Sequence, residues 1–413
     1  MHDQKKRDLV ALASIPLIMT LANSMLIPVL PLMQKKLGIS SVKASLIITV
    51  YAAVSIVCIP IAGYLSDRFG RKLIIIIGLS IAAIGGVVSG WSAWQLDHYA
   101  AYIGILIGRF IQGIGAAGAF PIVLPLVGDM FTSDEQVSSS LGMIETSNTF
   151  GKVVSPILGS ALTLVVWYLP LAIIPVFCVI SIAAIAIFVK VPKKNDEQQK
   201  MTFKAFLHDV GNILYKDGRW LYAIFAIGGI AMYIMFGFLY HMSTMLEEKH
   251  GIDGIKKGAL LAIPLSAICI ASYFTGKLIG TNKCKMKWFN FTGAVILTGS
   301  MSMFLFLDTT RLITNLILLS IGGLGIGLIL PSLDALITEG IDKKQRGTIT
   351  SLYSSMRFIG VAAGPLITSF FLDNDRLVFY IFTGMGLLCC GIALFAIHPS
   401  DEQEGKEGDL VPT

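Results

Sequence analysis

Long apolar segments separated by short polar ones follow one another along almost the whole chain. A helix needs about 20 apolar residues to cross the hydrocarbon core of a bilayer, which is about 30 Å thick. The pattern therefore predicts an all-α integral membrane protein with twelve transmembrane helices. They are residues 9–33, 43–65, 73–91, 99–127, 138–163, 167–190, 220–243, 257–280, 288–307, 312–337, 348–372 and 377–397.

One polar stretch is much longer than the others. It covers residues 191–219, includes the charged run VPKKNDEQQK and separates the first six spans from the last six. We therefore expect an N-terminal six-helix bundle over 1–190, a cytoplasmic linker over 191–219 and a C-terminal six-helix bundle over 220–397. The tail 398–413 has no apolar pattern, and we expect it to be disordered.

The two halves carry the same helix-shaping residues at equivalent places. Two parallel six-helix repeats are a transporter architecture, in which the substrate site lies near mid-membrane between the halves. The repeated pairs, 210 or 209 residues apart, are Gly113 with Gly323, Gly115 with Gly325, Pro121 with Pro331, Gly151 with Gly360 and Pro156 with Pro365.

The composition excludes an ordinary soluble domain. The chain is 54% hydrophobic and 14% charged, with a mean hydropathy of +0.75, whereas soluble domains carry about 25% charged residues. The six cysteines show no C-x-x-C spacing of a metal or redox site. We expect no metal, no enzymatic activity and no cofactor other than a proton gradient.

The net charge of +6 reflects membrane topology and not a nucleic-acid partner. A nucleic-acid binder gathers its cations on one face, whereas these lie in short runs between apolar segments. With both termini cytoplasmic, and with the cations at the span ends (Lys43, Lys190, Lys257 and Lys277) counted with the adjacent loops, the cytoplasmic segments hold 21 of the 32 Lys and Arg, the outer loops 8 and the span interiors 3. The positive-inside rule supports that orientation in the cell membrane.

The loop after the second span places glycines, one acid and several cations within ten residues, GYLSDRFGRK over 63–72. A glycine at its start allows close helix packing, and a later one allows a tight turn. The single acid among the cations requires a partner. The segment resembles the signature loop of the major facilitator superfamily, G-x-L-x-D-R-x-G-R-K, and the matching residues are Gly63, Asp67, Arg68, Gly70 and Arg71.

This resemblance implies a conformational latch on the cytoplasmic side. In the family, the acid that corresponds to Asp67 lies at the N-terminal end of the eleventh helix, where the helix dipole favours an anion. The arginine that corresponds to Arg71 pairs with an acid that closes the fourth helix, here Asp129. The equivalent loop of the second half, residues 276–281, lacks the acid, so we expect one latch only. The alternative is a simple positive-inside anchor.

Arg109 lies within the fourth span, where a charge is costly and by default functional. Its surroundings, LIGRFIQGIG, resemble a second motif of the superfamily, whose arginine is associated with proton coupling. The structural alternative is an ion pair with a loop acid near the cytoplasmic end. The following GIGAAG is a nucleotide-binding fingerprint only after a strand, so within this apolar run we interpret it as helix packing through small residues.

The fifth span, ETSNTFGKVVSPILG over 145–159, resembles the antiporter motif of exporters in the superfamily, except that Ser155 replaces the usual glycine before Pro156. Gly151, Ser155 and Gly159 form a ridge of small residues that lets another helix approach. Pro156 bends the helix because it removes a backbone donor. In the eleventh span, Gly364 and Pro365 are expected to have the same packing role.

Glu145 and Lys152 are seven residues apart on this span, which is about 10 Å along one helix face. Each therefore needs water, substrate or a charge on another helix as its partner. A low dielectric favours the neutral form of a carboxyl group, which can then exchange protons near neutral pH. We interpret Glu145 as the leading proton carrier, assisted by Arg109 and Asp67. Structural pairing and direct substrate binding of Glu145 remain alternatives.

Several other polar and adaptable side chains are candidates for the central cavity. Many drug exporters of the superfamily carry an acid in the first helix, where this chain has Asn23. Arg357 corresponds by the repeat to Asn148, and such a pair suits an anionic or zwitterionic group. In the alternative, Arg357 neutralises Glu145 or Asp334.

The seventh span is rich in methionine and aromatic residues, including Met235 and Phe236. Such side chains repack around varied apolar ligands, although the same stripe also serves as interhelical filler. His241 lies near the outer end of this span, where we expect a solvated position.

Over nearly its whole length, the chain resembles the drug:proton antiporter branch of the major facilitator superfamily. The resemblance implies two six-helix bundles that rock around a central cavity and export amphipathic small molecules in exchange for protons. We expect a monomer that contacts membrane lipids and a small-molecule substrate. A proton-coupled uptake symporter and a flippase of a lipid-linked substrate are the alternatives.

Overall fold

The computed structural model describes residues 2–130, 134–189, 211, 218–280, 282–307, 311–341 and 343–397. The side chains of 2–6, 129, 134–139, 141–142, 338–339 and 343–348 lie outside this description. The predicted tail and most of the predicted linker also lie outside it. Asp129, which the sequence places in the latch, is described by its backbone only.

In the described part of the first half, every regular element is a helix. The elements are α1 (His2–Ser24), a 3-10 turn η1 (Ile27–Val29), α2 (Leu30–Leu37), α3 (Ser41–Phe69), α4 (Arg71–Gln95), α5 (His98–Ala117), α6 (Phe120–Met130), α7 (Asp134–Thr163), α8 (Leu169–Ala172) and α9 (Ile174–Phe188).

The second half is equally helical over its described residues. Its elements are α11 (Gly218–Glu248), α12 (Gly254–Ile279), α13 (Lys283–Met303), α14 (Leu312–Gly340), α15 (Lys343–Phe370) and α16 (Asp375–Phe395). Together the elements form the twelve predicted spans, so the predicted fold class is confirmed.

Three spans of the first half are broken and not continuous as predicted. The first contains α1, η1 and α2, because Pro28 and Pro31 begin new turns after residue 24. The fourth contains α5 and α6, which are separated just before Pro121. The sixth contains α8 and α9, each with a proline in its first turn. A proline fits the first turn of a helix because the amide hydrogen it lacks has no partner there.

Nine of the described spans are long and apolar enough to cross a membrane by composition alone. The other three are α7, α13 and α15. The predicted cavity residues Glu145 and Lys152 lie on α7, and Arg357 lies on α15. These charged residues are one reason why α7 and α15 are less apolar than the other spans.

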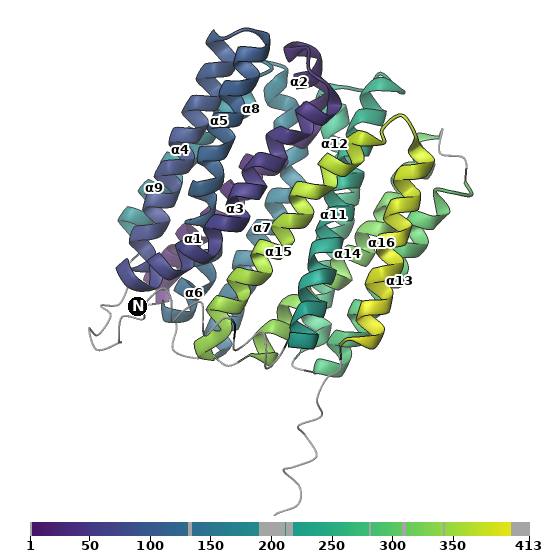
Figure 1. Ribbon diagram of the computed structural model, residues 1–413. Helices are drawn as coiled ribbons and strands as arrows, with labels where there is room; N and C mark the ends of the chain where they lie inside the picture. Colours follow the sequence, from purple (N-terminus) through teal and green to yellow (C-terminus); the bar gives the residue numbers. More distant parts are fainter. Residues whose placement is uncertain are drawn as a thin grey trace, which may run out of the picture.

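The two halves lie side by side, the first with α3, α4, α5 and α9 and the second with α13, α14 and α16 (Figure 1). They meet along two helix pairs, α3 with α15 and α7 with α12. We call the side where α1 begins and α16 ends the terminal face, and the opposite side the distal face.

Glycine contacts confirm the internal repeat. A Cβ atom on Gly113 would lie 2.6 Å from the Tyr51 carbonyl of the second span, and one on Gly323 would lie 2.6 Å from the Pro264 carbonyl of the eighth. Real Cβ atoms do not approach this closely, so both positions need glycine. The GIGAAG run is thus a packing surface within a helix and not a nucleotide-binding loop.

Large apolar side chains cover the outside of the bundle. Soluble monomers rarely expose contiguous apolar patches above a few hundred Å², so lipid is the solvent that suits this surface. Examples of exposed side chains are Val57, Trp94, Val165, Ile313 and Phe306, the last 82% exposed.

Candidate functional site

Four charged side chains come together between the halves, and we call them the central charge cluster. Glu145 and Lys152 belong to α7 of the first half, whereas Asp334 of α14 and Arg357 of α15 belong to the second. Lys152 interacts electrostatically with the other three. The structure therefore brings two acids and two bases from three helices to the interface between the halves.

Within this cluster, Arg357 pairs with Asp334. Arg357 Nη1 lies 3.6 Å from Asp334 Oδ1, and the two side chains are 14% and 34% exposed. The cation also stands over the ring of Tyr353, 5.5 Å from its centre. Of the two acids that could neutralise Arg357, Asp334 is the one in direct contact, and Glu145 acts at longer range.

Glu145 is held by neutral groups. Its Oε1 accepts a hydrogen bond of 3.0 Å from Asn148 Nδ2, and Asn148 Oδ1 accepts one of 2.5 Å from the Thr20 hydroxyl of α1. Glu145 is half-buried, whereas Asn148 is 3% exposed. The chain from Thr20 through Asn148 orients the carboxylate and leaves it partly open to water.

Lys152 lies at the boundary between these charges and a narrow apolar cavity. The cavity runs between the halves and is lined by Lys152, Ser155 and Pro156 of α7, by Ser24, Ile27 and Pro28 of the first span, and by Met235, Phe236 and Leu239 of α11, with Leu261 and Leu265 of α12. It therefore contains the predicted residues Met235 and Phe236 beside Lys152.

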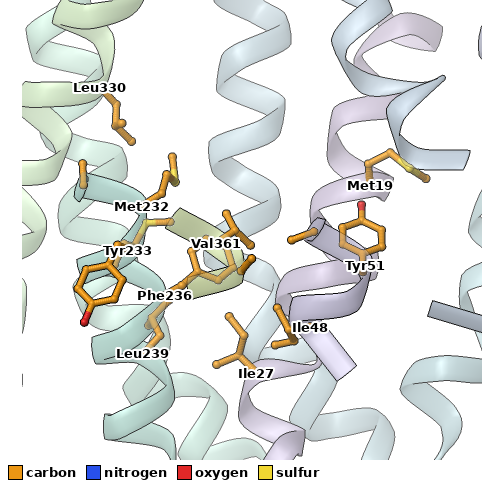
Figure 2. Close-up of a cluster of buried hydrophobic side chains, with 14 of the residues drawn as sticks. Met19, Ile27, Ile48, Tyr51, Met232, Tyr233, Phe236, Leu239, Leu330 and Val361 are labelled. Carbon is orange, nitrogen blue, oxygen red and sulfur yellow. The ribbon is translucent and has the colours of Figure 1, made fainter. Parts of the chain in front are cut away.

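Apolar side chains continue across the same interface. Figure 2 shows Phe236, Leu239 and Val361 of the second half opposite Ile27 and Ile48 of the first. All five are buried. The Met and aromatic stripe of the seventh span thus faces protein, because α11 is the most buried helix among the spans that are apolar enough to cross a membrane.

Arg109 lies elsewhere, in a cage of neutral acceptors inside the first half. Its guanidinium is 0% exposed and donates to Ile47 O (2.9 Å), Ala22 O (3.3 Å), Gln112 Oε1 (2.7 Å) and Asn23 Oδ1 (2.6 Å). It also stands 4.3 Å from the centre of the Tyr51 ring. No carboxylate pairs with it among the described residues, and Asn23 serves this cage and does not line the cavity.

In the signature loop, Arg71 contacts both its own turn and the fourth span. Arg71 Nη2 lies 3.3 Å from Asp67 Oδ1, and Nη1 donates to the Pro125 carbonyl of α6. Gly70 has a φ of +99° at the turn from α3 to α4, a conformation that favours glycine. A Cβ on Gly63 would lie 3.7 Å from Ser351 Oγ of α15, so this loop reaches both the fourth and the eleventh spans.

The other two cations of the signature loop contact α3 itself and the end of the sixth span. Arg68 Nη1 donates to the Tyr64 hydroxyl at 3.3 Å, and Lys72 Nζ donates to the Val189 carbonyl at 2.6 Å. The predicted contact of Arg71 with Asp129 involves a side chain outside the described set, so it stays a prediction. The same holds for a contact of Asp67 with the side chains of the first turn of α15.

The ridge on α7 packs against the first span. A Cβ on Gly151 would lie 3.3 Å from Leu17 O, and one on Gly159 would overlap the Met25 carbonyl. Ser155 is fully buried, and its hydroxyl donates to Lys152 O at 3.0 Å. On α15, Gly364 meets Tyr233 of α11 in the same manner. Pro156 and Pro365 both lie inside their helices.

A set of ion pairs at the distal face had no signal in the sequence. Glu247 of α11 binds Lys35 of α2 through Oε1 and Lys257 of α12 through Oε2, each at 2.8 Å. Lys35 belongs to the first half and the other two belong to the second. Together with a 3.2 Å hydrogen bond between Ser45 and Ser369, this bridge joins the halves at the distal face.

The solvated position expected for His241 is wrong. Its side chain is 8% exposed, and Nε2 lies 2.9 Å from Asp375 Oδ1 of α16. Its ring also packs edge-on against Phe379. The position near the end of the span suggested solvent, but α16 covers that end of α11.

Comparison with known proteins defines the class. A sequence model of the family described as Major Facilitator Superfamily matches residues 12–365 and 316–412. The chain belongs to the major facilitator superfamily. It is a multi-pass membrane transporter and not an enzyme.

Among curated relatives, the bacillibactin exporter of Bacillus subtilis (strain 168) is 46% identical over 97% of this chain and 98% of its own length. Multidrug resistance protein 2 of the same strain is 23% identical, with 94% of each chain covered. These relatives support the efflux of small molecules by this transporter.

Two solved structures show the same fold. The human organic anion transporter MFSD10 matches with a TM-score of 0.72 at 17% identity, over 94% of this chain and 99% of its own. A bacterial homologue of the human lysosomal transporter Spinster, in an inward-facing and occupied conformation, matches with a TM-score of 0.70 at 14% identity, over 94% and 96%. At these identities, the similarity concerns the fold alone.

Proposed function

We propose that this protein exports an amphipathic small molecule in exchange for protons, and that bacillibactin or a close chemical relative of it is the substrate. The central charge cluster carries the proposal. It places two partly exposed carboxylates, Glu145 and Asp334, beside two cations at the interface between the halves. The 46% identity to a bacillibactin exporter supports the choice of substrate.

In the proposed cycle, Glu145 is the proton carrier. A proton on Glu145 removes its attraction to Lys152 and Arg357, so protonation changes the balance of charge across the interface. Arg357 keeps Asp334 as its direct partner. Arg109 acts by holding α1, α3 and α5 together and does not form an ion pair with Glu145. Asp67 and Arg71 would hold the signature loop against the fourth and eleventh spans.

The bridged distal face suits the inward-facing state of an alternating-access cycle. The excess of cations on the segments at the terminal face supports a cytoplasmic location of both termini in the cell membrane. Substrate would then enter from the terminal face, and the Glu247 bridge and the Ser45 to Ser369 contact would break before release outside.

The test uses inside-out vesicles with an acidic interior, a pH-sensitive dye and added bacillibactin. We expect bacillibactin to enter the vesicles and dissipate the proton gradient with the wild type, and to do neither with Glu145→Gln. Glu248→Gln, which changes an exposed acid outside the cluster, should behave as the wild type and serves as the matched control.

Two outcomes would contradict parts of this proposal. Transport of bacillibactin with an undisturbed proton gradient would reject proton coupling. Absence of transport, with the protein verified in the vesicles, would reject bacillibactin as substrate, and a panel of lipophilic cations, zwitterions and organic anions would then identify the class.

A further inference from the structure

Lys152 has no direct partner for its charge within the described structure. The side chain is 8% exposed, and its ammonium group makes no hydrogen bond or ion pair with the described residues. The neighbouring acids are already engaged, because Asp334 pairs with Arg357 and Glu145 accepts from Asn148. A buried charge without a partner is costly, so an anion from outside the chain would be stabilised here.

The residues around Lys152 determine the shape and polarity of a ligand that carries such an anion. Toward the terminal face lie the charges of the cluster. Toward the distal face lies the apolar cavity, whose walls include Met235, Phe236, Leu239 and Leu265. The Ser24 hydroxyl also lines the cavity and makes no hydrogen bond to the described residues, so it can donate to the same ligand.

From this arrangement, we infer that Lys152 is the anchor for an anionic group of the transported molecule, whose apolar or aromatic body lies in the cavity between α1, α7, α11 and α12. This inference rests on the proposed function and names its substrate class as an amphipathic anion, in contrast to a lipophilic cation. Met235 suits the body because its flexible side chain adapts to irregular apolar shapes, and Phe236 offers a flat apolar ring for packing.

The cavity is narrow in this conformation, with room for about one water molecule. Its walls come from both halves, so movement of one half against the other changes its width. A ligand with a body larger than water therefore selects a conformation in which the halves are further apart at this level. Binding is coupled to the rocking motion for this reason.

The test measures binding of three matched probes to the purified full chain in a non-ionic detergent, by ligand-induced shifts of the melting temperature. The probes are 2-naphthoate, 2-naphthamide and 2-naphthylmethylammonium, which share one ring system and differ in charge. In the wild type, we expect naphthoate to bind at least tenfold more tightly than the amide and the ammonium compound to bind most weakly. Equal or reversed affinities in the wild type would overturn the inference without the use of any variant.

Two substitutions then assign the preference to Lys152. Lys152→Met should abolish the tenfold preference for naphthoate and keep the affinity for naphthamide, whereas Lys152→Arg should retain most of the preference. The melting temperature of ligand-free Lys152→Met should equal or exceed that of the wild type, because no direct bond is lost. Retention of the anion preference in Lys152→Met would overturn the assignment, as would a lower melting temperature of that ligand-free variant.

The binding assay and the vesicle assay fail separately. Preference for naphthoate without any proton movement in vesicles would reject proton-coupled export and leave the anion site standing. If the protein exports bacillibactin in exchange for protons but binds naphthoate equally well with and without Lys152, the anion site alone would be rejected.

Discussion

Asn23 Oδ1 accepts a hydrogen bond of 2.6 Å from Arg109 Nη2, and this contact ties the first span to the fourth inside the N-terminal half. The other hydrogen-bond acceptors of this guanidinium are two backbone carbonyls and one amide. A buried cation is therefore stabilised by dipoles and not by a carboxylate. Asn23 and Gln112 are the two acceptors that a substitution can remove without moving the backbone, and of these Asn23 comes from another span.

Replacement of Asn23 tests how much this cage depends on that oxygen. Asn23→Ala should reduce stability by about 1.5–3 kcal/mol, the usual contribution of a hydrogen bond to a charged group. Asn23→Asp supplies a carboxylate at the same place and should melt at or above the wild-type temperature. Thermal unfolding in detergent measures both, and an unchanged melting temperature in Asn23→Ala would contradict the role of Asn23.

The pair of Arg357 and Asp334 should show a measurable coupling energy. Asp334 also interacts with Lys152 and Glu145, so single substitutions mix several effects, and a double-mutant cycle is needed. Because Asp334 is 34% exposed and solvent screens such pairs, we expect a coupling of about 1 kcal/mol between Asp334→Asn and Arg357→Gln. Additive losses in melting temperature would show that the 3.6 Å contact contributes nothing.

The distal bridge should respond unequally to loss of its two lysine contacts. Lys35 is 58% exposed, so Lys35→Gln should cost no more than about 1 kcal/mol. Glu247→Gln leaves Lys257, whose side chain is 3% exposed, without its acid and should cost about 3–5 kcal/mol. Melting temperatures of the two variants decide the point. Because Glu247→Gln removes the contacts with both lysines, an equal loss in both variants would show that the buried contact with Lys257 contributes nothing.

The glycines of the repeat should differ in their tolerance of alanine. A Cβ on Gly360 would overlap the Gly229 carbonyl, whereas one on Gly151 would lie 3.3 Å from its neighbours and one on Gly391 would meet nothing within 4 Å. Overpacking costs about 1–3 kcal/mol, so Gly360→Ala should melt lowest and Gly151→Ala in between. Gly391→Ala, the control, should melt at or above the wild type. The reverse order in thermal unfolding would contradict the packing described.

The span count could be predicted because the length of an apolar segment is a local property. Breaks within spans were also marked locally, by Pro28, Pro31 and Pro121, although the hydropathy pattern alone treats each span as continuous. The charges at positions 109, 145, 152 and 357 could be predicted as functional candidates, because a charge in an apolar segment is costly wherever it lies. None of these inferences needs knowledge of a distant contact.

The partners of Arg109 and Glu145 could not be predicted, and for Arg357 the sequence left Glu145 and Asp334 as alternatives. Arg109 donates to Asn23, which is 86 positions away in the sequence. Glu145 accepts from Asn148, and Asn148 in turn accepts from Thr20, which is 128 positions away from it. Sequence spacing orders residues along one helix, but it does not say which helix lies opposite. For the same reason the burial of His241 was missed, since the helix that covers it begins near Asp375.

From the sequence alone follow the membrane location, the twelve spans, the two-fold repeat and the family, because each depends on composition, period or a contiguous motif. Only the packing of the helices decides that Arg109 is caged by neutral oxygens, that Asp334 neutralises Arg357 and that Lys152 is left facing an apolar cavity. The position of a residue on its helix fixes the direction of its side chain. Which side chain lies opposite it depends on how the neighbouring helix is rotated about its axis and at what angle the two helices cross. That geometry is fixed only when the helices are packed, within the first half for Arg109 and between the halves for Asp334, Arg357 and Lys152.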